Sequence, residues 1–480
     1  MNKKTTSRRS VSVRETVKTA VLMSLLVSLI ALVVVYVSGM RAYEEAISKN
    51  TPGENFDRLW SVVSDAESEG LDASNLLPEI IGYKQSTSPT PLAAIASADG
   101  ISELYNITKP CILELFGNNS VCSVLSAVEG KHRIAAAKAS EEFVYLRYHE
   151  PVLYQLIYAY AADTLTVSEN DVATGGTGNI GAYISELIIV PDRDFAAHRF
   201  VAYATDSYGN YYEFRPGAHV LTSDFYISKL ATTASAVTVF PLYFSDDHRF
   251  TSDEPIVDGE IEYYPISMAY LDPGNFALHD ALLDLFEYNK EKLDGYSDVT
   301  GYVFVDTHSQ LRIEEGYISF QTTDATVSDG SLRGIRIDSL LGYVSSDASG
   351  LFDKLTALDS LIGRLEKISN ELVGGSADVC LGEVYSSDSL LVIEYFLTYN
   401  GIRIGNEPYL RAVLTDQTIC ELTLHPIFVT PVDTTELSLS LGYILDSLDK
   451  TGNLDKNRQI DSARFLYTDG HADWIVTYVN

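Results

Sequence analysis

The sequence predicts an α+β protein: a single N-terminal transmembrane helix, then a largely helical domain and two α+β domains of similar topology with mainly antiparallel sheets. Three observations support this prediction. A basic tail precedes a long uncharged apolar run, strand patterns and amphipathic helix patterns alternate twice along the chain, and 480 residues exceed one ordinary domain. The expected parts are a basic cytoplasmic tail (1–18), a transmembrane anchor (19–40), a helical N-terminal extracytoplasmic domain (43–139), a central α+β domain (140–292) and a C-terminal α+β domain (293–480).

The first element is the anchor. Residues 1–18 carry a net charge of +5, and residues 19–40 contain no charged side chain. At about 1.5 Å per residue, such a helix spans a hydrocarbon core of roughly 30 Å. The alternative is a cleaved signal peptide, but its apolar region would be only about 7–15 residues long and would end at small residues. The segment that follows here, Gly39-Met40-Arg41-Ala42-Tyr43, is a poor cleavage site. The positive-inside rule then places the N-terminus in the cytoplasm and the bulk of the chain outside the cell membrane.

Small residues form a stripe along this predicted helix. Ala20, Ser24 and Ser28 recur every four residues, and Ala31 and Ser38 roughly continue the same face. Rows of this kind let two helices approach closely inside lipid. We therefore expect a transmembrane interface here, although serine and alanine are also ordinary residues of membrane spans.

The helical domain is expected from residues 71–139, which are rich in Ala, Leu and Ile and are broken by prolines. Within it, the segment VCSVLSAVEGKHRIAAAKASEEF (121–143) is predicted to be helical. The pattern changes at EEFVYLRYHEPV (141–152), where alternating side chains predict a strand, and LYQLIYAYAA (153–162) then predicts a short helix.

The two α+β domains are expected from repeated strand and helix patterns. In the central domain, strands are predicted at YISELIIVPD, RFVAYATDSYGNYYEF and VTVFPLYF, followed by a helix at 276–289 with leucines on one face. In the C-terminal domain, strands precede an amphipathic helix at 350–372 and a meander of strands follows it. A helix at ELSLSLGYILDSLD and a final strand at SARFLYTDGHADWIVTYV end the chain.

The meander contains the strongest local turn signal of the chain. Asn400-Gly401 is the dipeptide most favoured in two-residue hairpins, and a type I′ turn would suit it. We interpret Asn400 and Gly401 as a fold marker of the C-terminal domain and, at a loop tip, at most as a contact surface for a partner.

The four cysteines leave their redox state open. Outside the cell, Cys111 with Cys122 and Cys380 with Cys420 would each form a disulfide within one expected domain. One cysteine per 120 residues is too few for a disulfide scaffold, so buried free thiols are the alternative.

Charge and motifs restrict the function. The formal net charge is −32, which leaves −37 outside the basic tail and argues against nucleic acid or wall polyanions as partners. The chain has no G-x-S-x-G, S-x-x-K, H-E-x-x-H or P-loop motif. Its nine histidines are scattered singly, so that His149 and His425 are expected to be surface or core groups. We expect no enzyme activity, no metal and no cofactor.

Several segments resemble the YycH-type regulators, membrane-anchored accessory proteins of a cell-wall two-component system. The residues from Arg14 to Met40 resemble the anchor of that family, and EEFVYLRYHEPVLYQLIYAY (141–160) resembles the opening of its central domain. Residues 395–422 are similar to its late hairpin, and the end of the chain, with its Trp, looks like the last strand of the related YycI-type proteins. At 305–308 this chain has Val-Asp-Thr-His where the family usually has Tyr-Thr-Asp-Gly.

The resemblance implies a helical domain followed by two α+β domains, and a non-catalytic role without active-site residues. It also implies contacts with a WalK-type sensor histidine kinase and with a YycI-type sister protein, through transmembrane helices and external domains. An alternative that the residues leave open is a membrane-anchored protein that binds or processes a cell-wall component.

Overall fold

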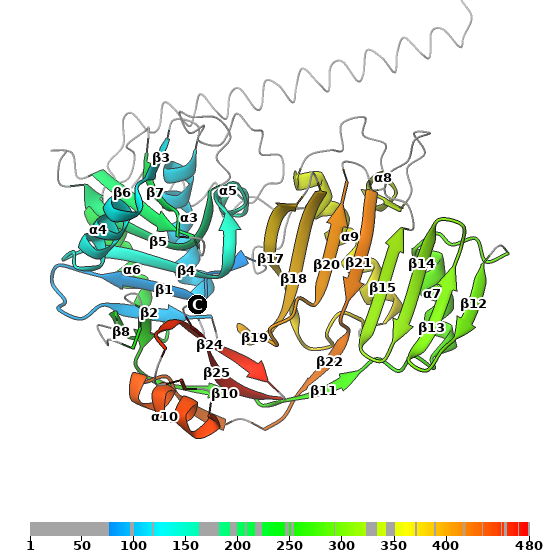
Figure 1. The fold of residues 1–480 in the computed structure, drawn as a ribbon. Coiled ribbons are helices and arrows are strands. Elements are labelled where there is room, and N and C mark those ends of the chain that lie inside the picture. The colour runs from blue at the N-terminus through cyan, green and yellow to red at the C-terminus, as the bar shows by residue number, and fades with distance from the viewer. Residues whose placement is uncertain are drawn as a thin grey trace, which may run out of the picture. The chain divides into compact units, whose positions relative to one another are not determined.

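The computed structural model describes the chain from Leu76 onward, and all of these residues belong to one compact unit, Trp60–Asn480 (Figure 1). Residues 1–75 lie outside the described part, and so do these shorter segments: 97–99, 118–119, 163–181, 193–198, 207–208, 217–222, 245–248, 251–253, 292, 323–333, 342–350, 370–371, 388–389, 416–417, 434, 453, 456–457, 469 and 479–480.

The first half of the described chain builds a nine-stranded antiparallel sheet with the order β3-β7-β6-β5-β4-β1-β2-β8-β9. Its strands are β1 Ile80–Lys84, β2 Leu92–Ile95, β3 Val121–Leu125, β4 Phe143–Leu153, β5 Tyr183–Asp192, β6 Arg199–Thr205, β7 Tyr211–Arg215, β8 Phe240–Phe244 and β9 Pro255–Val257. The central strands β4, β5 and β6 are buried along most of their length, as is typical of strands with both faces covered.

Four helices cover this sheet: α3 Ile101–Phe116, α4 Ala127–Lys138, α5 Tyr154–Ala161 and α6 Ser223–Ala234. Helix α3 packs against α5 and α6, and α4 packs against β5, β6 and β7. The start of α4 follows directly from its sequence, because the Ser126 side chain accepts a hydrogen bond from the Glu129 backbone N–H, as an N-cap serine does.

The second half builds a twelve-stranded sheet; in Figure 1 its red strands lie below the centre, and most of its yellow, orange and green strands lie on the right. Ten strands follow the order β12-β13-β14-β15-β21-β20-β18-β19-β24-β25, and β16 and β17 pair with β21 and β18. The strands are β12 Asp294–Ser297, β13 Gly301–Val305, β14 Ser309–Glu314, β15 Tyr317–Thr322, β16 Ile335–Arg336, β17 Asp378–Ser387, β18 Leu390–Tyr399, β19 Ile402–Ile404, β20 Leu410–Leu414, β21 Thr418–Leu424, β24 Ile460–Thr468 and β25 His471–Tyr478.

Helices α7 Phe276–Leu285, α8 Ile337–Leu341 and α9 Leu351–Ile368 pack on this sheet and on one another, and α10 Leu441–Thr451 packs against β25. Two short ladders connect the halves of the chain: β10 Glu260–Tyr263 pairs with β23 Thr435–Ser438, and β11 Ile266–Tyr270 pairs with β22 Ile427–Pro431. Strand β24 also lies beside residues of the first half, since Ile460 forms a bridge with Phe250 and the Ala463 N–H donates to Glu254.

The structure confirms a mixed α+β fold with mainly antiparallel sheets. Helices α7 and α9 lie within the predicted ranges 276–289 and 350–372, and α9 buries Leu355, Leu358 and Leu361 as its periodicity predicts. The predicted final strand is in fact a hairpin, because β24 and β25 are antiparallel neighbours.

The expected domain boundaries do not coincide with the sheets. In the described part of 43–139, β1 pairs with β4 and β3 pairs with β7, so these residues complete the nine-stranded sheet and do not form a separate helical domain. The segment predicted to be helical from 121 begins with strand β3. Helix α7, assigned to the central domain, packs against α9 and β13, on the other side of the expected boundary at 292/293. The two sheets also differ in strand number and order.

None of the helices in the described part is long and apolar enough to cross a membrane. The predicted anchor at 19–40 lies outside that part.

Candidate functional site

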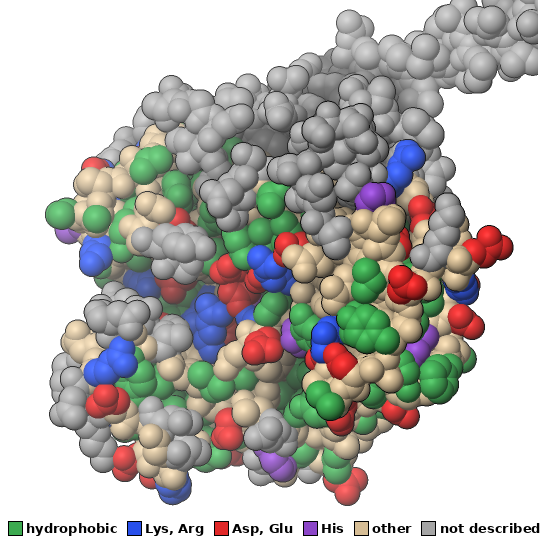
Figure 2. Space-filling view, turned by 45° about the vertical axis from the view of Figure 1, so that its right-hand side comes forward, with side chains coloured by type: hydrophobic (Ala, Val, Ile, Leu, Met, Phe, Trp, Pro, Cys, Tyr) green, Lys and Arg blue, Asp and Glu red, His purple; other side chains and the backbone are tan. Residues whose placement is uncertain are grey.

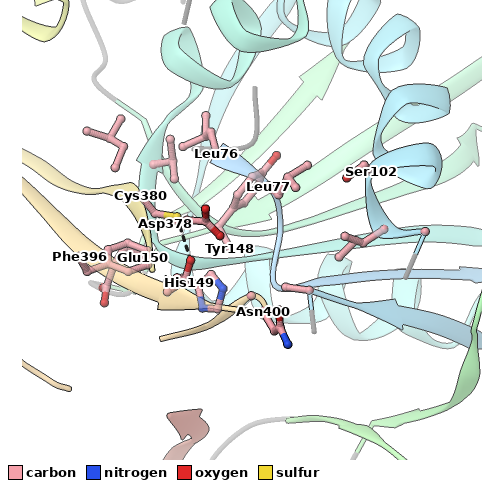
Figure 3. Close-up of a pocket in the computed structure, with 17 residues that line it drawn as sticks. Leu76, Leu77, Ser102, Tyr148, His149, Glu150, Asp378, Cys380, Phe396 and Asn400 are labelled. Atoms are coloured by element: carbon pink, nitrogen blue, oxygen red, sulfur yellow. Dashed lines mark hydrogen bonds between the residues drawn. The ribbon is translucent and has the colours of Figure 1, made fainter. Parts of the chain in front are cut away.

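A cavity of about 300 Å³ lies where β4 of the nine-stranded sheet meets β17 and β18 of the twelve-stranded sheet (Figure 3). We call it the inter-sheet cavity. Its lining comes from both sheets and mixes apolar and polar side chains: Leu76, Leu77, Ala96, Gly100, Ile101, Ser102, Tyr148, His149, Glu150, Val152, Asp378, Cys380, Leu381, Phe396, Thr398, Asn400 and Gly401. Figure 2 shows acidic and basic side chains gathered in a hollow on one face of the molecule.

An irregularity in β4 gives the cavity its most polar wall. The register between β4 and β5 shifts between Arg147 and Val152, so the residues between them leave the regular ladder. Such bulges re-aim side chains. Here the irregular segment carries His149 and Glu150, which line the cavity together with the side chains of β17 and β18.

The opposite wall is held by contacts within the twelve-stranded sheet and across to β4. The Cys380 thiol and the Thr398 hydroxyl lie 3.3 Å apart, within hydrogen-bonding distance. The Phe396 ring meets the His149 imidazole edge to face, with 5.7 Å between the ring centroids. This aromatic contact joins the two sheets at the floor of the cavity.

The hairpin between β18 and β19 also reaches the first sheet. Asn400 and Gly401 connect the paired residues Tyr399 and Ile402, with φ angles of 48° and 69°. Two positive φ angles are what a type I′ turn requires. A Cβ atom at Gly401 would lie 2.3 Å from the backbone carbonyl of Ala96, so the turn backbone lies directly against the end of β2. Both turn residues line the inter-sheet cavity.

His149 is held in its neutral form. Burial lowers its pKa to about 4, and Arg464, Arg403 and Arg147 act in the same direction, while Glu79 opposes them. Within the described part of the chain the imidazole has no hydrogen-bond partner. A neutral imidazole offers one N–H donor and one acceptor nitrogen to whatever enters the cavity.

Next to His149, the carboxylate of Glu150 holds two arginines of the twelve-stranded sheet. Arg403 of β19 donates a hydrogen bond to it, and Arg464 of β24 donates another at 3.2 Å. The same Arg464 nitrogen donates to the backbone carbonyl of His149 at 2.7 Å. We call Glu150, Arg403 and Arg464 the Glu150 cluster. Burial and then the neighbouring Arg464 lower the pKa of Arg403 to about 10.

A second group of charges lies deeper, along β4. Arg147 donates a hydrogen bond to Glu254 at 2.7 Å and lies 3.3 Å from a carboxylate oxygen of Glu79. Glu254 also accepts a hydrogen bond from the backbone N–H of Ala463 in β24. We call Arg147, Glu79 and Glu254 the Arg147 cluster. Burial opposes the charge of Arg147, but the two carboxylates outweigh it and raise its pKa well above the usual value.

The two carboxylates of the Arg147 cluster respond differently to their surroundings. Burial raises the pKa of Glu254 above its usual value despite Arg147. For Glu79, burial is outweighed by Arg147, His149 and Arg464, and the pKa is lowered. A buried charge is tolerated only when paired and hydrogen-bonded, so both clusters tie β4 to residues far along the chain.

The site combines a cavity between the two sheets with ion pairs that join them. Among the described residues, no three His, Cys, Asp or Glu side chains are grouped as metal ligands. The carboxylate nearest to His149 in sequence, Glu150, is engaged by two arginines, and the Cys380 thiol lies beside a threonine. We assign no catalytic role to these residues.

The structure describes only some of the site residues that the sequence predicts. Ala20, Ser24, Ser28, Ala31 and Ser38 lie outside the described residues. Asn400 and Gly401 are at the inter-sheet cavity. None of the four cysteines, Cys111, Cys122, Cys380 and Cys420, is in a disulfide in the structure. Burial raises the pKa of the Cys111 thiol well above its usual value and that of the Cys122 thiol to about 11. Both thiols are therefore protonated at neutral pH.

Sequence reasoning missed the charged residues that join the sheets. His149 was expected to be an ordinary surface or core group, and Glu150, Arg403 and Arg464 carried no motif. The available signal was chemical: Arg147 and His149 alternate with apolar residues within one strand, and Arg403 stands between two isoleucines of β19.

Comparison with known proteins supports the fold. No protein-family model and no curated protein sequence matches this chain. Its structure is similar to the crystal structure of YycH from Bacillus subtilis, with a TM-score of 0.50 and 11% sequence identity. The similarity covers 86% of this chain and 96% of that structure. At this identity the similarity shows a YycH-like fold and nothing about residues of the site.

Proposed function

We propose that this chain is a non-catalytic, membrane-anchored accessory regulator of a cell-envelope sensor histidine kinase. The observation that carries the proposal is the YycH-like fold, which extends over 86% of the chain. The sequence resemblance to the YycH-type regulators supports it from a separate direction, as does the basic tail followed by an apolar run at 19–40. In this proposal the N-terminus is cytoplasmic and the bulk of the chain is extracellular.

Regulation would act through differential contacts with two states of the kinase, since a partner shifts an equilibrium only when it binds one state better. The predicted transmembrane stripe would make one contact, and the external domains, with a YycI-type sister protein, would make others. The Glu150 and Arg147 clusters support this role because they join the two sheets, so that a partner bound to one sheet could change the position of the other.

The test is co-purification of the full-length chain with the kinase from membranes, together with a transcriptional reporter of kinase output. Changing Ala20, Ser24 and Ser28 to Leu is expected to abolish co-purification. A matched control alters the opposite face of the predicted helix with Leu22→Val, Leu26→Val and Val33→Leu, and should leave it unchanged. If the variant with three leucines binds the kinase and signals normally, the proposal of a transmembrane interface is wrong. If the wild-type chain does not co-purify with the kinase, the proposed function is wrong.

The inter-sheet cavity favours one alternative, a membrane-anchored protein that binds or processes a wall component. Cavities of 300 Å³ or more with convergent polar groups are typical of small-molecule sites. Titration of the full-length chain with a soluble muropeptide distinguishes the two. Saturable binding that is lost in Ser102→Trp, which would fill the cavity, would support the alternative; absence of binding would remove it.

A further inference from the structure

The outer edge of the twelve-stranded sheet is formed by β12, which has a hydrogen-bonded neighbour on one side only among the described strands. All four of its residues are exposed. It is well held on its inner side, because Asp298 accepts hydrogen bonds from the backbone N–H groups of Thr300 and Gly301 and pairs with Arg312 at 2.7 Å. The edge is therefore exposed and preorganised.

The ladder shows which backbone groups of β12 are available. The N–H of Asp298 donates to the carbonyl of Gly301 at 3.0 Å, so that pair is of the hydrogen-bonded kind. Hydrogen-bonded and non-hydrogen-bonded pairs alternate along an antiparallel ladder. Gly295 and Ser297, which lie opposite Phe304 and Tyr302, therefore point their N–H and C=O groups away from β13.

Aromatic side chains flank this edge on both faces. On the face covered by α7, the exposed Phe276 ring contacts Tyr302 with 5.5 Å between centroids. The Phe304 ring contacts His279 of α7, and Gly295 on β12 puts no side chain over it. On the other face, by strand alternation, Tyr296 is 56% exposed. Phe276, Tyr270 and Tyr296 are the three most exposed aromatic side chains of the described residues.

The surroundings of the edge are acidic. Between residues 276 and 300 the sequence contains six carboxylates and two lysines, a net charge of −4. Asp294 lies on β12 itself, on the same face as Tyr296. A second copy of this chain is a poor occupant, since pairing two β12 edges would bring two such acidic surfaces together. An added strand with basic side chains complements the charge and can place a cation over Tyr296.

We propose that β12 is a docking edge for an extended segment of a partner protein in which basic residues alternate with apolar ones. The partner strand would hydrogen-bond to Gly295 and Ser297. Its apolar side chains would lie on the α7 face against Phe276 and Phe304, and its Lys or Arg side chains would lie beside Asp294 and Tyr296. This is strand addition, in which the backbone gives affinity and alternate side chains give specificity. The inference deepens the proposed regulatory function and rests on it for the identity of the partner.

The test uses the full-length chain in detergent and a capped synthetic peptide, KVKYKVK, with binding followed by calorimetry. Saturable binding is expected, and Ser297→Pro should weaken it at least tenfold, because it removes an outward N–H without touching the bonds to β13. Asp294→Lys should weaken it several-fold. Glu260→Lys, an exposed acidic site on β10, is the matched control and should leave it unchanged.

Two peptides keep the test independent of protein folding. A KVKYKVK peptide with N-methyl groups on alternate backbone nitrogens keeps its charge and should not bind, and EVEYEVE should not bind. Equal binding of the N-methylated peptide, or of KVKYKVK to Ser297→Pro, would overturn the docking edge. The peptide assay contains no kinase, so its result is independent of the co-purification. If the peptide does not bind but the kinase co-purifies, only the docking edge is contradicted. If the peptide binds but no kinase co-purifies, only the proposed function is contradicted.

Discussion

Arg147 and Arg312 each hold two carboxylates, and the two sites differ in how much water reaches them. Arg147 of β4 pairs with Glu254 and Glu79 between the sheets, with side chains that are 8%, 5% and 19% exposed. Arg312 of β14 pairs with Asp298 and Glu314 near the outer edge, where the side chains are 23–32% exposed. We call the latter residues the Arg312 cluster.

The comparison shows that burial, and not the types of residue, decides how much an ion cluster contributes to the stability of the fold. Around Arg312, water solvates the charges whether or not they pair, and exposed pairs contribute little to stability. Around Arg147, each charge depends on its partners because little solvent reaches the side chains, so the loss of one partner leaves an uncompensated buried charge. Through the hydrogen bond from the Ala463 backbone N–H to Glu254, the buried cluster is one of the places where the two halves of the chain are coupled.

The largest expected effect comes from breaking the buried cluster. Arg147→Met keeps much of the side-chain volume but leaves Glu79 and Glu254 without their cation. We expect the free energy of unfolding to fall by about 3–5 kcal/mol, the usual cost of removing one partner of a buried pair. Chemical denaturation followed by circular dichroism measures it.

The matched control is Arg312→Met in the exposed cluster. We expect its unfolding midpoint to be indistinguishable from wild type. If the two variants lose the same stability, burial is not what separates the clusters, and the comparison fails.

The pH dependence sharpens the comparison through His149. Its pKa falls from 6.5 to about 4 in the folded chain, so between these values the unfolded state binds more protons. Stability should therefore decrease as pH falls from 6.5 to 4, by about 3 kcal/mol in total, at about 1.4 kcal/mol per pKa unit.

Neighbouring carboxylates titrate in the same window, so the measurement is the difference between wild type and His149→Gln. As pH falls, the lowered pKa of Glu79 also decreases the free energy of unfolding, whereas the raised pKa of Glu254 increases it. We expect His149→Gln to flatten the curve of stability against pH. An unchanged slope would show that the imidazole is solvated.

A smaller effect is expected from Glu150→Gln, which leaves Arg403 and Arg464 together without their shared carboxylate. Hydrogen bonds to charged groups contribute about 1.5–3 kcal/mol, so we expect a loss of about 2 kcal/mol. Hydrogen exchange should also become faster in β19 and β24, where the two arginines lie. Faster exchange spread evenly over both sheets would contradict a local role in joining them.

Much of the fold could be predicted because it is written in local patterns. The alternation of β4 and the leucine stripes of α7 and α9 fix element type within short windows. Strand β3 was missed because VCSVL is short and runs into a good helix, and only its pairing with β7, some 90 residues later, makes it a strand. The domain boundaries failed for the same reason, since they depend on pairing between distant strands.

The site was less predictable than the fold. Glu150 and Arg464 are 314 residues apart in sequence, and no local pattern announces that they meet. Asn400-Gly401 does announce a turn, which the φ angles of both residues fit. The dipeptide does not predict the contact with Ala96, because Ala96 lies at the end of β2 in the other sheet.

That contact gives the smallest and most selective prediction. Gly401 and Gly405 have nearly the same φ, 69° and 70°, but a Cβ at Gly405 meets nothing within 4 Å, whereas one at Gly401 meets the backbone of Ala96. Alanine at either position carries the left-handed strain of roughly 1–2 kcal/mol. Overpacking should cost Gly401→Ala about 1–2 kcal/mol more. The difference between the two unfolding free energies thus isolates the contact of the hairpin with the first sheet. Equal losses in the two variants would mean that the turn does not press on Ala96 in solution, and the hairpin would then couple the sheets only through Arg403.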